Sequence, residues 1–169
     1  MQLDALLSLV KEKLTLKFGE AITSSELSYD YPVFTVTREK IEEVLYFLHD
    51  DEQLGFRFLT TLCGLHFPDN KGQELAVMYQ LHNLEKNTRI RLKTYMPVND
   101  PVVHTMTSLF AAAGWLERET YDFFGIRFTG HPDLRRILNV DEMEGFPMRK
   151  EFPIEDQTRD DKKDAMFGR

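Results

Sequence analysis

The sequence has little cysteine and no apolar run of the length that a bilayer requires. Its one cysteine, Cys63, cannot form a disulfide within the chain. The longest apolar stretches fall far short of the roughly 20 residues that a membrane-spanning helix needs. The chain opens with Gln2, Leu3 and Asp4, where a signal peptide would place a basic stretch and then an apolar run. We therefore expect a cytoplasmic protein that reaches a membrane only through other proteins.

Basic residues are outnumbered by acidic ones. Among 169 residues, 21 are Lys or Arg and 28 are Asp or Glu, so the formal net charge is -7. Nucleic-acid affinity depends largely on Lys and Arg that neutralise phosphates, so no nucleic-acid partner is expected. The sequence also has no glycine-rich fingerprint of a nucleotide-binding loop and no cysteine cluster of the kind that holds an iron–sulfur centre.

The apolar residues that are present predict one core and its first elements. A hydrophobic content of 42% in a chain of this length suits one domain and not two. Apolar residues recur at three- and four-residue spacing over residues 3–14, which predicts a helix that Gly19 ends. The stretch through Ser24 and Ser25 is expected to be a loop. Residues 33–36 predict a strand, and Thr37 is expected to cap a second helix.

The middle of the chain predicts a sheet. Three β-rich runs follow one another, at residues 56–67, 75–82 and 88–95. Apolar and basic residues alternate in the last run, which predicts a sheet with one face exposed to solvent. Asp100 and Pro101 favour the start of another helix over residues 102–110, with Gly114 as its stop and a further helical turn from Trp115. The predicted fold class is α+β: a small, mostly antiparallel sheet with helices packed on one face.

After residue 138 the periodic pattern ends. Apolar residues are scattered among charges and prolines: Met143, Phe146, Met148, Phe152, Ile154, Met166 and Phe167. A long structureless segment is unusual in a compact domain, and aromatic residues argue against a solvated disordered tail. We therefore expect an α+β domain over residues 1–138 and an extended C-terminal arm over residues 139–169 that packs on a partner.

Cys63, His66 and His82 have a spacing that raises the question of a metal site. If residues 56–67 form a strand, Cys63 and His66 point to opposite faces and cannot close on one ion without a bulge. The sequence shows no local base or positive field that would ionise the thiol. We expect a buried structural cysteine and no metal site.

The densest acidic cluster is in residues 117–122. Glu119 and Asp122 would share a helical face and could do acid–base work. Arg118 precedes Asp122 by four residues, so a neutralising ion pair is the favoured interpretation. A small stand-alone enzyme that uses Glu119, Asp122 and His131 remains an alternative, and a free adaptor with a short-lived partner is another.

Special residues cluster beyond this point without a catalytic pattern. They are Phe123–Gly125, Gly130–Pro132, Arg135–Arg136 and Arg149–Lys150. Glycine and proline define turns, and cations in an acidic chain suit carboxylate pairing within or between subunits. The cluster therefore indicates an interface, although it could instead attach the last helix to the sheet.

Residues 116–138 resemble the signature of the 30 kDa, or C, subunit family of respiratory complex I, the NADH:quinone oxidoreductase. Residues 144–153 resemble the motif that follows it in the family. The second match departs in detail: Met143 stands where tryptophan is common, Phe146 where histidine is common and Met148 where leucine is usual. The preceding α+β order is compatible with the same family.

The resemblance implies a cofactor-free subunit of the peripheral arm, in a complex that passes electrons from NADH to quinone and translocates protons. It would lie on the quinone-site (49 kDa-type, D) subunit, near iron–sulfur subunits, at the cytoplasmic side of the cell membrane and without inserting into it. NADH, FMN, iron–sulfur clusters and quinone would be bound by other subunits. Equivalent subunits occur in membrane-bound hydrogenases and ferredoxin-dependent quinone reductases, which the sequence does not separate.

No catalytic, cofactor-binding or metal-binding residue is therefore expected on this chain. The residues expected to meet a partner are Arg135, Arg136, Phe146, Arg149, Lys150 and Phe152.

Overall fold

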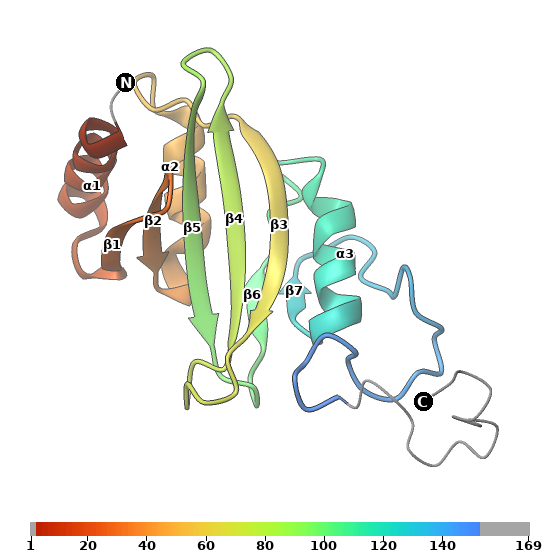
Figure 1. Cartoon of the computed structure of the whole chain (residues 1–169). Coiled ribbons are helices and arrows are strands. Elements are labelled where there is room, and N and C mark those ends of the chain that lie inside the picture. Colours follow the sequence, from red (N-terminus) through yellow and green to blue (C-terminus); the bar gives the residue numbers. More distant parts are fainter. Residues whose placement is uncertain (1–2, 153–169) are drawn as a thin grey trace, which may run out of the picture.

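The computed structural model describes residues 3–152 and has a five-stranded sheet at its centre (Figure 1). The strands are β1 (Ile22–Ser28), β2 (Tyr31–Val36), β3 (Phe58–His66), β4 (Leu75–Asn83) and β5 (Thr88–Met96). They lie in the order β1-β2-β5-β4-β3, and every neighbouring pair is antiparallel except β2 with β5. The predicted α+β class with a mostly antiparallel sheet is confirmed.

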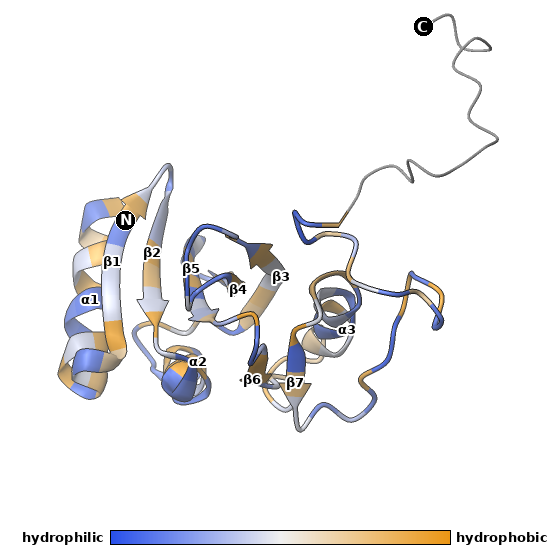
Figure 2. Cartoon of the chain, turned by 90° about the horizontal axis from the view of Figure 1, so that it is seen from below, coloured by the Kyte–Doolittle hydropathy of each residue, from blue (hydrophilic) through white to orange (hydrophobic). Residues whose placement is uncertain are grey.

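Within the described residues, the sheet has three α-helices around it. They are α1 (Leu3–Phe18), α2 (Ile41–Asp50) and α3 (Ala113–Phe124), and short 3-10 turns at Gly19–Ala21 and Arg38–Lys40 lead out of α1 and into α2. Helix α2 lies on one side of the sheet, whereas α1 contacts β1 and β2 toward one edge and α3 contacts β3 at the other (Figure 2). The core is formed by apolar side chains between these layers, including Phe34, Leu45, Leu62, Tyr79 and Leu92.

The periodic patterns predicted most of these elements correctly. The apolar stripe of α2 is fully buried at Ile41, Val44, Leu45 and Leu48. The three middle strands, β3 to β5, form at the predicted places, and Ile90 and Leu92 face the core between the more exposed Arg89 and Arg91. Amphipathic periodicity is a strong signal because one face of each element must be removed from water.

Three local predictions are wrong. Residues 22–28 form edge strand β1, not a loop, because their backbone pairs with β2 although few side chains are apolar. Residues 102–110 form the short strand β6 (Val102–His104) and turns, not a helix, and Gly114 lies inside α3. Thr37 precedes a 3-10 turn but makes no side-chain capping bond.

Strand β6 positions the C-terminal part of the molecule. It pairs in parallel with β7 (Arg127–Thr129), and α3 connects the two. After β7 the chain runs beside α3 and comes back to the end of α3 (Figure 1). We call residues 130–152 the return segment; it contains neither helix nor strand. None of the helices in residues 3–152 is long and apolar enough to cross a membrane.

The predicted arm begins within this return segment. Residues 139–152 contact α3 and β3 of the same chain, as detailed below. The rest of the predicted arm, with Ile154, Met166 and Phe167, lies outside the described residues. The division at residue 138 and the packing of the arm on a partner stay predictions.

Candidate partner interface

The C-terminal end of α3 is capped by the return segment. A helix leaves its last four carbonyl groups without partners in the helix. Here the carbonyl of residue 121 accepts from the Gly125 amide at 2.8 Å, and that of residue 122 accepts from the Arg136 guanidinium at 3.1 Å. The carbonyl of residue 123 accepts from the Met148 amide at 3.2 Å, and that of residue 124 accepts from the Arg149 Nε at 2.8 Å. Two of the four donors are cations, which the negative end of the helix dipole favours. The return segment is therefore bound to α3 by the bonding capacity of the helix terminus.

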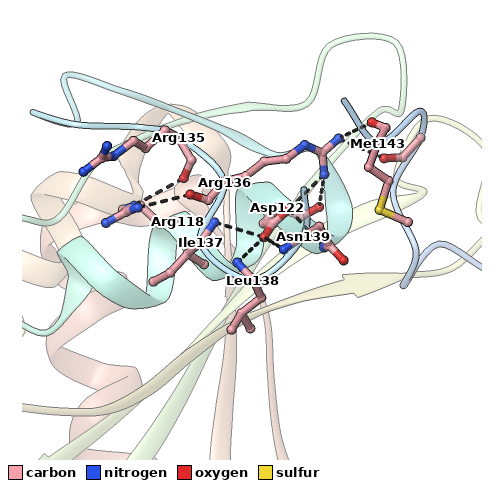
Figure 3. Close-up of polar contacts among 9 residues, drawn as sticks. Arg118, Asp122, Arg135, Arg136, Ile137, Leu138, Asn139 and Met143 are labelled. Carbon is pink, nitrogen blue, oxygen red and sulfur yellow. Dashed lines mark hydrogen bonds and ion pairs between the residues drawn. The ribbon is translucent and has the colours of Figure 1, made fainter. Parts of the chain in front are cut away.

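The carboxylate of Asp122 accepts hydrogen bonds from several residues in the first half of the return segment (Figure 3). Its Oδ2 accepts from the amides of residues 137, 138 and 139 at 3.1, 2.8 and 2.9 Å. Its Oδ1 accepts from Arg136 at 2.8 Å and from the side-chain amide of Asn139 at 3.0 Å. Burial by itself would raise the pKa of Asp122, but these donors outweigh it and hold the pKa well below its usual range. Asp122 is therefore an ionised structural anchor.

Two arginines connect α3 and the return segment through backbone carbonyls (Figure 3). Arg136 reaches from the Asp122 carboxylate to the carbonyls of Met143 at 2.9 Å and Gly145 at 3.2 Å. Arg118, on α3, donates to the carbonyls of Arg135 at 3.2 Å and Arg136 at 3.1 Å. A guanidinium has five donors in a rigid plane, so it can bind several carbonyls at once. This bonding orders a segment that has no regular secondary structure.

The ring of Phe146 is clamped between two guanidinium groups. Its centroid lies 5.5 Å from Cζ of Arg136 and 4.6 Å from Cζ of Arg149, within the range of cation–π attraction. The ring also rests on Gly125, which has a φ of 71° and where a Cβ atom would overlap the ring. Glycine is required there by both the backbone conformation and the lack of space.

The second half of the return segment reaches the sheet. The amide of Lys150 donates to Nδ1 of His66, at the end of β3, at 3.0 Å. Two residues earlier along the strand, Gly64 leaves room for the ring of Phe124, which a Cβ atom would overlap. Close packing of α3 on β3 thus sets the place where the return segment meets the sheet.

The six residues predicted to meet a partner fall into two groups. Three are engaged inside the chain: Arg136, Phe146 and Arg149. Phe152 is half-buried beside Gly145. The side chain of Arg135 is 71% exposed and pairs with Asp133 at 3.0 Å, and Lys150 is exposed. The inward group joins the return segment to α3 and not the last helix to the sheet, which was the alternative interpretation. A role at a partner stays a prediction for all six residues.

The structure does not bring Glu119, Asp122 and His131 together as a catalytic group. Glu119 is exposed, whereas Asp122 is fully buried and saturated with donors. His131 bonds the carbonyl of Gly114 through Nε2 at 3.0 Å and accepts the Asp133 amide at Nδ1. The expected ion pair of Arg118 with Asp122 is also wrong, because Asp122 pairs with Arg136 and Arg118 binds carbonyls.

Glu117 was not predicted to be special, and it is as buried as Asp122. Its carboxylate accepts from the hydroxyl of Thr105 and from the amide of Met106 at 2.7 Å, and so connects α3 to the chain after β6. Burial raises the pKa of Glu117 to about 7, although these bonds and nearby His104 oppose the rise. The sequence gave no sign that Glu117 is buried, because it is an acidic residue with charged residues beside it.

Cys63 and His66 lie on β3 in unbroken register with β4, so they point to opposite faces as predicted. Cys63 is half-buried, and burial raises the pKa of its thiol. Among residues 3–152, no three His, Cys, Asp or Glu side chains are grouped as a metal ion would require.

Relatives of known sequence share this region. The family model for the 30 kDa subunit of respiratory-chain NADH dehydrogenase matches residues 34–158. The NADH-quinone oxidoreductase C subunit numbered 1 in Rhizobium meliloti is 43% identical over 136 residues, which cover 80% of this chain and 67% of that protein. The C subunit of the Streptomyces coelicolor enzyme is 42% identical over 121 residues, which cover 72% of this chain and 48% of that protein. The chain thus spans from about half to two thirds of these relatives.

Solved structures share the fold. A structure of Nqo5, described as a trypsin-resistant fragment (1-134), aligns with a TM-score of 0.62 and 32% identity over 79% of this chain and all of that one. A chain of the archaeal membrane-bound sulfane sulfur reductase aligns with a TM-score of 0.72 over 87% of this chain and 85% of that one, and at 24% identity it supports the fold alone. The chain therefore belongs to the family of the 30 kDa subunit of respiratory-chain NADH dehydrogenase, which is the C-subunit family of NADH-quinone oxidoreductases.

Proposed function

We propose that the chain is a docking subunit of a proton-translocating NADH:quinone oxidoreductase and supports its quinone-site (49 kDa-type, D) subunit. It acts from the peripheral arm, on the cytoplasmic side of the cell membrane, where neighbouring iron–sulfur subunits and the quinone-site subunit hold it. The return segment and the residues after it form the face that meets the partner. Family membership supports the complex, and the geometry of the return segment supports the docking role.

The observation that carries this proposal is the two-sided construction of the return segment. Its inner side is tied to α3 through Asp122, Arg136 and Arg149. Its outer side leaves large apolar groups in solvent: Leu138 and Val140 are each 66% exposed, and Met148 is 56% exposed. Apolar groups on an ordered, irregular segment suit a partner surface, because binding then costs little further ordering.

We propose that electron transfer takes place on other subunits, which bind NADH, FMN, the iron–sulfur clusters and quinone. The contacts of this region support that division of roles. Asp122 is saturated by five donors, and Arg136 bonds that carboxylate and backbone carbonyls. Side chains with such partners stabilise the local structure, and they are not free to bind or protonate a substrate. We propose that this chain contributes to catalysis through assembly of the complex.

A tagged full-length chain, extracted from its own membranes in mild detergent, tests the proposal. We expect the quinone-site subunit and iron–sulfur subunits to be recovered with it in equal amounts, together with NADH:quinone activity. Recovery of hydrogenase or ferredoxin-dependent reductase subunits would place the chain in one of those related complexes instead. Recovery of no such subunit, or turnover by the purified chain alone, would contradict the docking role.

Limited proteolysis gives a second test. The solved Nqo5 structure is of a fragment that resists trypsin. For this chain we expect trypsin to remove part of the segment after residue 138 from the isolated protein and to spare it in the complex. Equal cleavage in the two states would argue that the segment has no partner.

A further inference from the structure

The only tryptophan of the chain lies on the outer face of α3 and is largely in solvent. Trp115 is 64% exposed, although a large aromatic side chain usually buries most of its surface. Trp115, Arg118 and Asp122 follow each other at three- and four-residue spacing, so they share one face of the helix. The return segment covers this face from Arg118 onward, and Trp115 lies just beyond the covered part.

The tryptophan is held in place by a neighbour that is itself anchored. The guanidinium of Arg118 lies 5.2 Å from the centroid of the Trp115 ring, in cation–π range. The same guanidinium is fastened to the carbonyls of Arg135 and Arg136 (Figure 3). Little side-chain freedom is left to lose on binding, which favours affinity. Exposed, ordered Trp and Arg are the residue types most enriched among binding hot spots.

Arg118 has a charge that the described part of the chain does not neutralise. Its hydrogen bonds go to uncharged carbonyls, and no ion pair within residues 3–152 includes it. The side chain is half-buried, and an acidic group on a partner would complement its charge.

The return segment carries a further exposed apolar side chain. The Leu138 amide is held by Asp122, one helical turn after Arg118, and its side chain is 66% exposed. We propose, on the basis of the docking function, that Trp115 and Arg118 anchor this chain to a neighbouring subunit. The indole inserts into an apolar pocket of that subunit, and a carboxylate at the rim of the pocket pairs with Arg118. Leu138 extends the contact.

Variants of the tagged full-length chain test this anchor by the amount of partner subunits that a detergent wash leaves bound. Trp115→Ala is expected to lower that amount at least tenfold. Tyr29→Ala is the matched control, since Tyr29 is a 95% exposed aromatic at the β1–β2 turn, and it is expected to retain the partners fully. Equal retention by Trp115→Ala and the control would overturn the anchor while leaving the docking function intact.

Arg118→Gln tests the charge, because it can still donate to one carbonyl of the return segment. We expect weaker retention at low salt and a flatter loss of partners as salt rises, since a screened charge pair has been removed. The urea midpoint of each isolated variant must match that of the unmodified chain, so that misfolding is distinguished from lost binding. An unchanged salt profile would overturn the carboxylate contact.

Tryptophan fluorescence and oligomeric state distinguish other occupants of this surface. In the isolated chain we expect Trp115 to be quenched readily by acrylamide, with or without residues 153–169. Shielding that disappears when those residues are removed would assign the surface to the chain's own C-terminus. A dimer that Trp115→Ala converts to monomer would assign it to a second copy. Either result overturns the proposed partner. If the unmodified chain recovers no oxidoreductase subunits, the docking function itself fails.

Discussion

The two halves of α3 each bury a carboxyl group, and burial shifts the pKa values of the two groups in opposite directions once their donors are counted. Glu117 and Asp122 are both 0% exposed. Glu117 has a hydroxyl and one amide as donors, and burial raises its pKa to about 7. Asp122 has three backbone amides, a side-chain amide and Arg136, and its pKa is held well below the usual range. Burial alone therefore does not decide ionisation; the number and charge of the donors do.

The difference matches what each end does. At the Asp122 end, a fixed negative charge organises the return segment, which has no regular structure of its own. At the Glu117 end, the carboxylate joins α3 to the chain after β6, where backbone pairing with β7 already provides order. The strongly ionised group is thus placed where the chain most depends on side-chain bonds.

The largest effect should come from reversing the charge that neutralises Asp122. Arg136→Glu places two carboxylates together in a site where the side chains are 13% and 0% exposed. Breaking a buried pair costs about 3–5 kcal/mol, and we expect the free energy of unfolding to fall by that amount in urea denaturation. Arg135→Glu is the matched control, because that side chain is 71% exposed, and its unfolding should stay within about 0.5 kcal/mol. Equal destabilisation by the two variants would refute the anchor.

The next largest effect is expected from truncation after residue 138. The sequence predicts that the α+β domain still folds. In the structure, the truncated chain would lack the hydrogen bond from Asn139 to Asp122 and two of the donors that cap the C-terminus of α3. It would also lack the ring of Phe146, which rests on Gly125. We expect a folded chain that is about 2–4 kcal/mol less stable, from a half-buried aromatic side chain and a few hydrogen bonds. Circular dichroism with urea titration measures both, and an unfolded fragment would show that the segment belongs to the core.

Glu117→Gln should change the pH dependence of stability. Between about pH 4.5 and 7 the folded state keeps a proton on Glu117 that the unfolded state has released, so stability falls as pH rises. The slope from this group is at most about 1.4 kcal/mol per pH unit. The variant should therefore lose less stability than the unmodified chain between pH 5 and 8. Subtracting the two curves cancels the titrating groups that do not interact with Glu117, and parallel curves would disprove the raised pKa.

Asp122→Asn provides the comparison at the other end of the helix. Because the folded pKa of Asp122 is lowered, its stabilising contribution is present above the unfolded value of 3.8 and is lost as pH falls below it. The Asn variant should therefore be less stable at neutral pH and lose less stability on acidification. A difference that appears only between pH 5 and 8 would contradict this assignment.

The smallest effect is expected at Gly125. Gly125→Ala puts a side chain at a positive φ of 71° and against the ring of Phe146. We expect a loss of about 1–3 kcal/mol in unfolding free energy from backbone strain and overlap. Adding Phe146→Ala to this variant removes the overlap, so the second substitution should cost less than it does in the unmodified chain. A double-mutant cycle measures the coupling, and additive costs would show that the ring does not rest on Gly125.

The regular elements were predictable where side-chain burial follows a period. Helix α2 and strands β3 and β5 bury alternate or every third or fourth residue, and the sequence displays that directly. Strand β4 is buried almost throughout and appears in the sequence as a β-rich run. Strand β1 was missed because it is an edge strand held by backbone bonds to β2, with Ser24 and Ser25 in its middle. Residues 102–110 were assigned to a helix because Asp100 and Pro101 resemble a helix start and the apolar residues that follow have helical spacing. Strand β6 and turns bury Val103, Met106 and Phe110 equally well.

The interface role of the six predicted residues stays a prediction, but the expected contacts within this region can be compared with the structure. Residues 116–138 carried the resemblance, and they include the first part of the return segment. The expected pair of Arg118 and Asp122 is local along the helix, but the actual partner of Asp122 is Arg136, in the chain that comes back across α3. Nothing in the string of acids around Glu117 distinguished the buried ones from the exposed Glu119.

The sequence by itself determined the family and the α+β class, because these depend on local periodicity and on residue types in fixed order. The tertiary structure decided which charges face inward. It placed Arg136 and Arg149 within the chain, left Arg135 exposed, and gave Glu117 and Asp122 opposite pKa shifts. Burial and donor count depend on contacts between residues far apart in sequence, so only the folded chain contains that information.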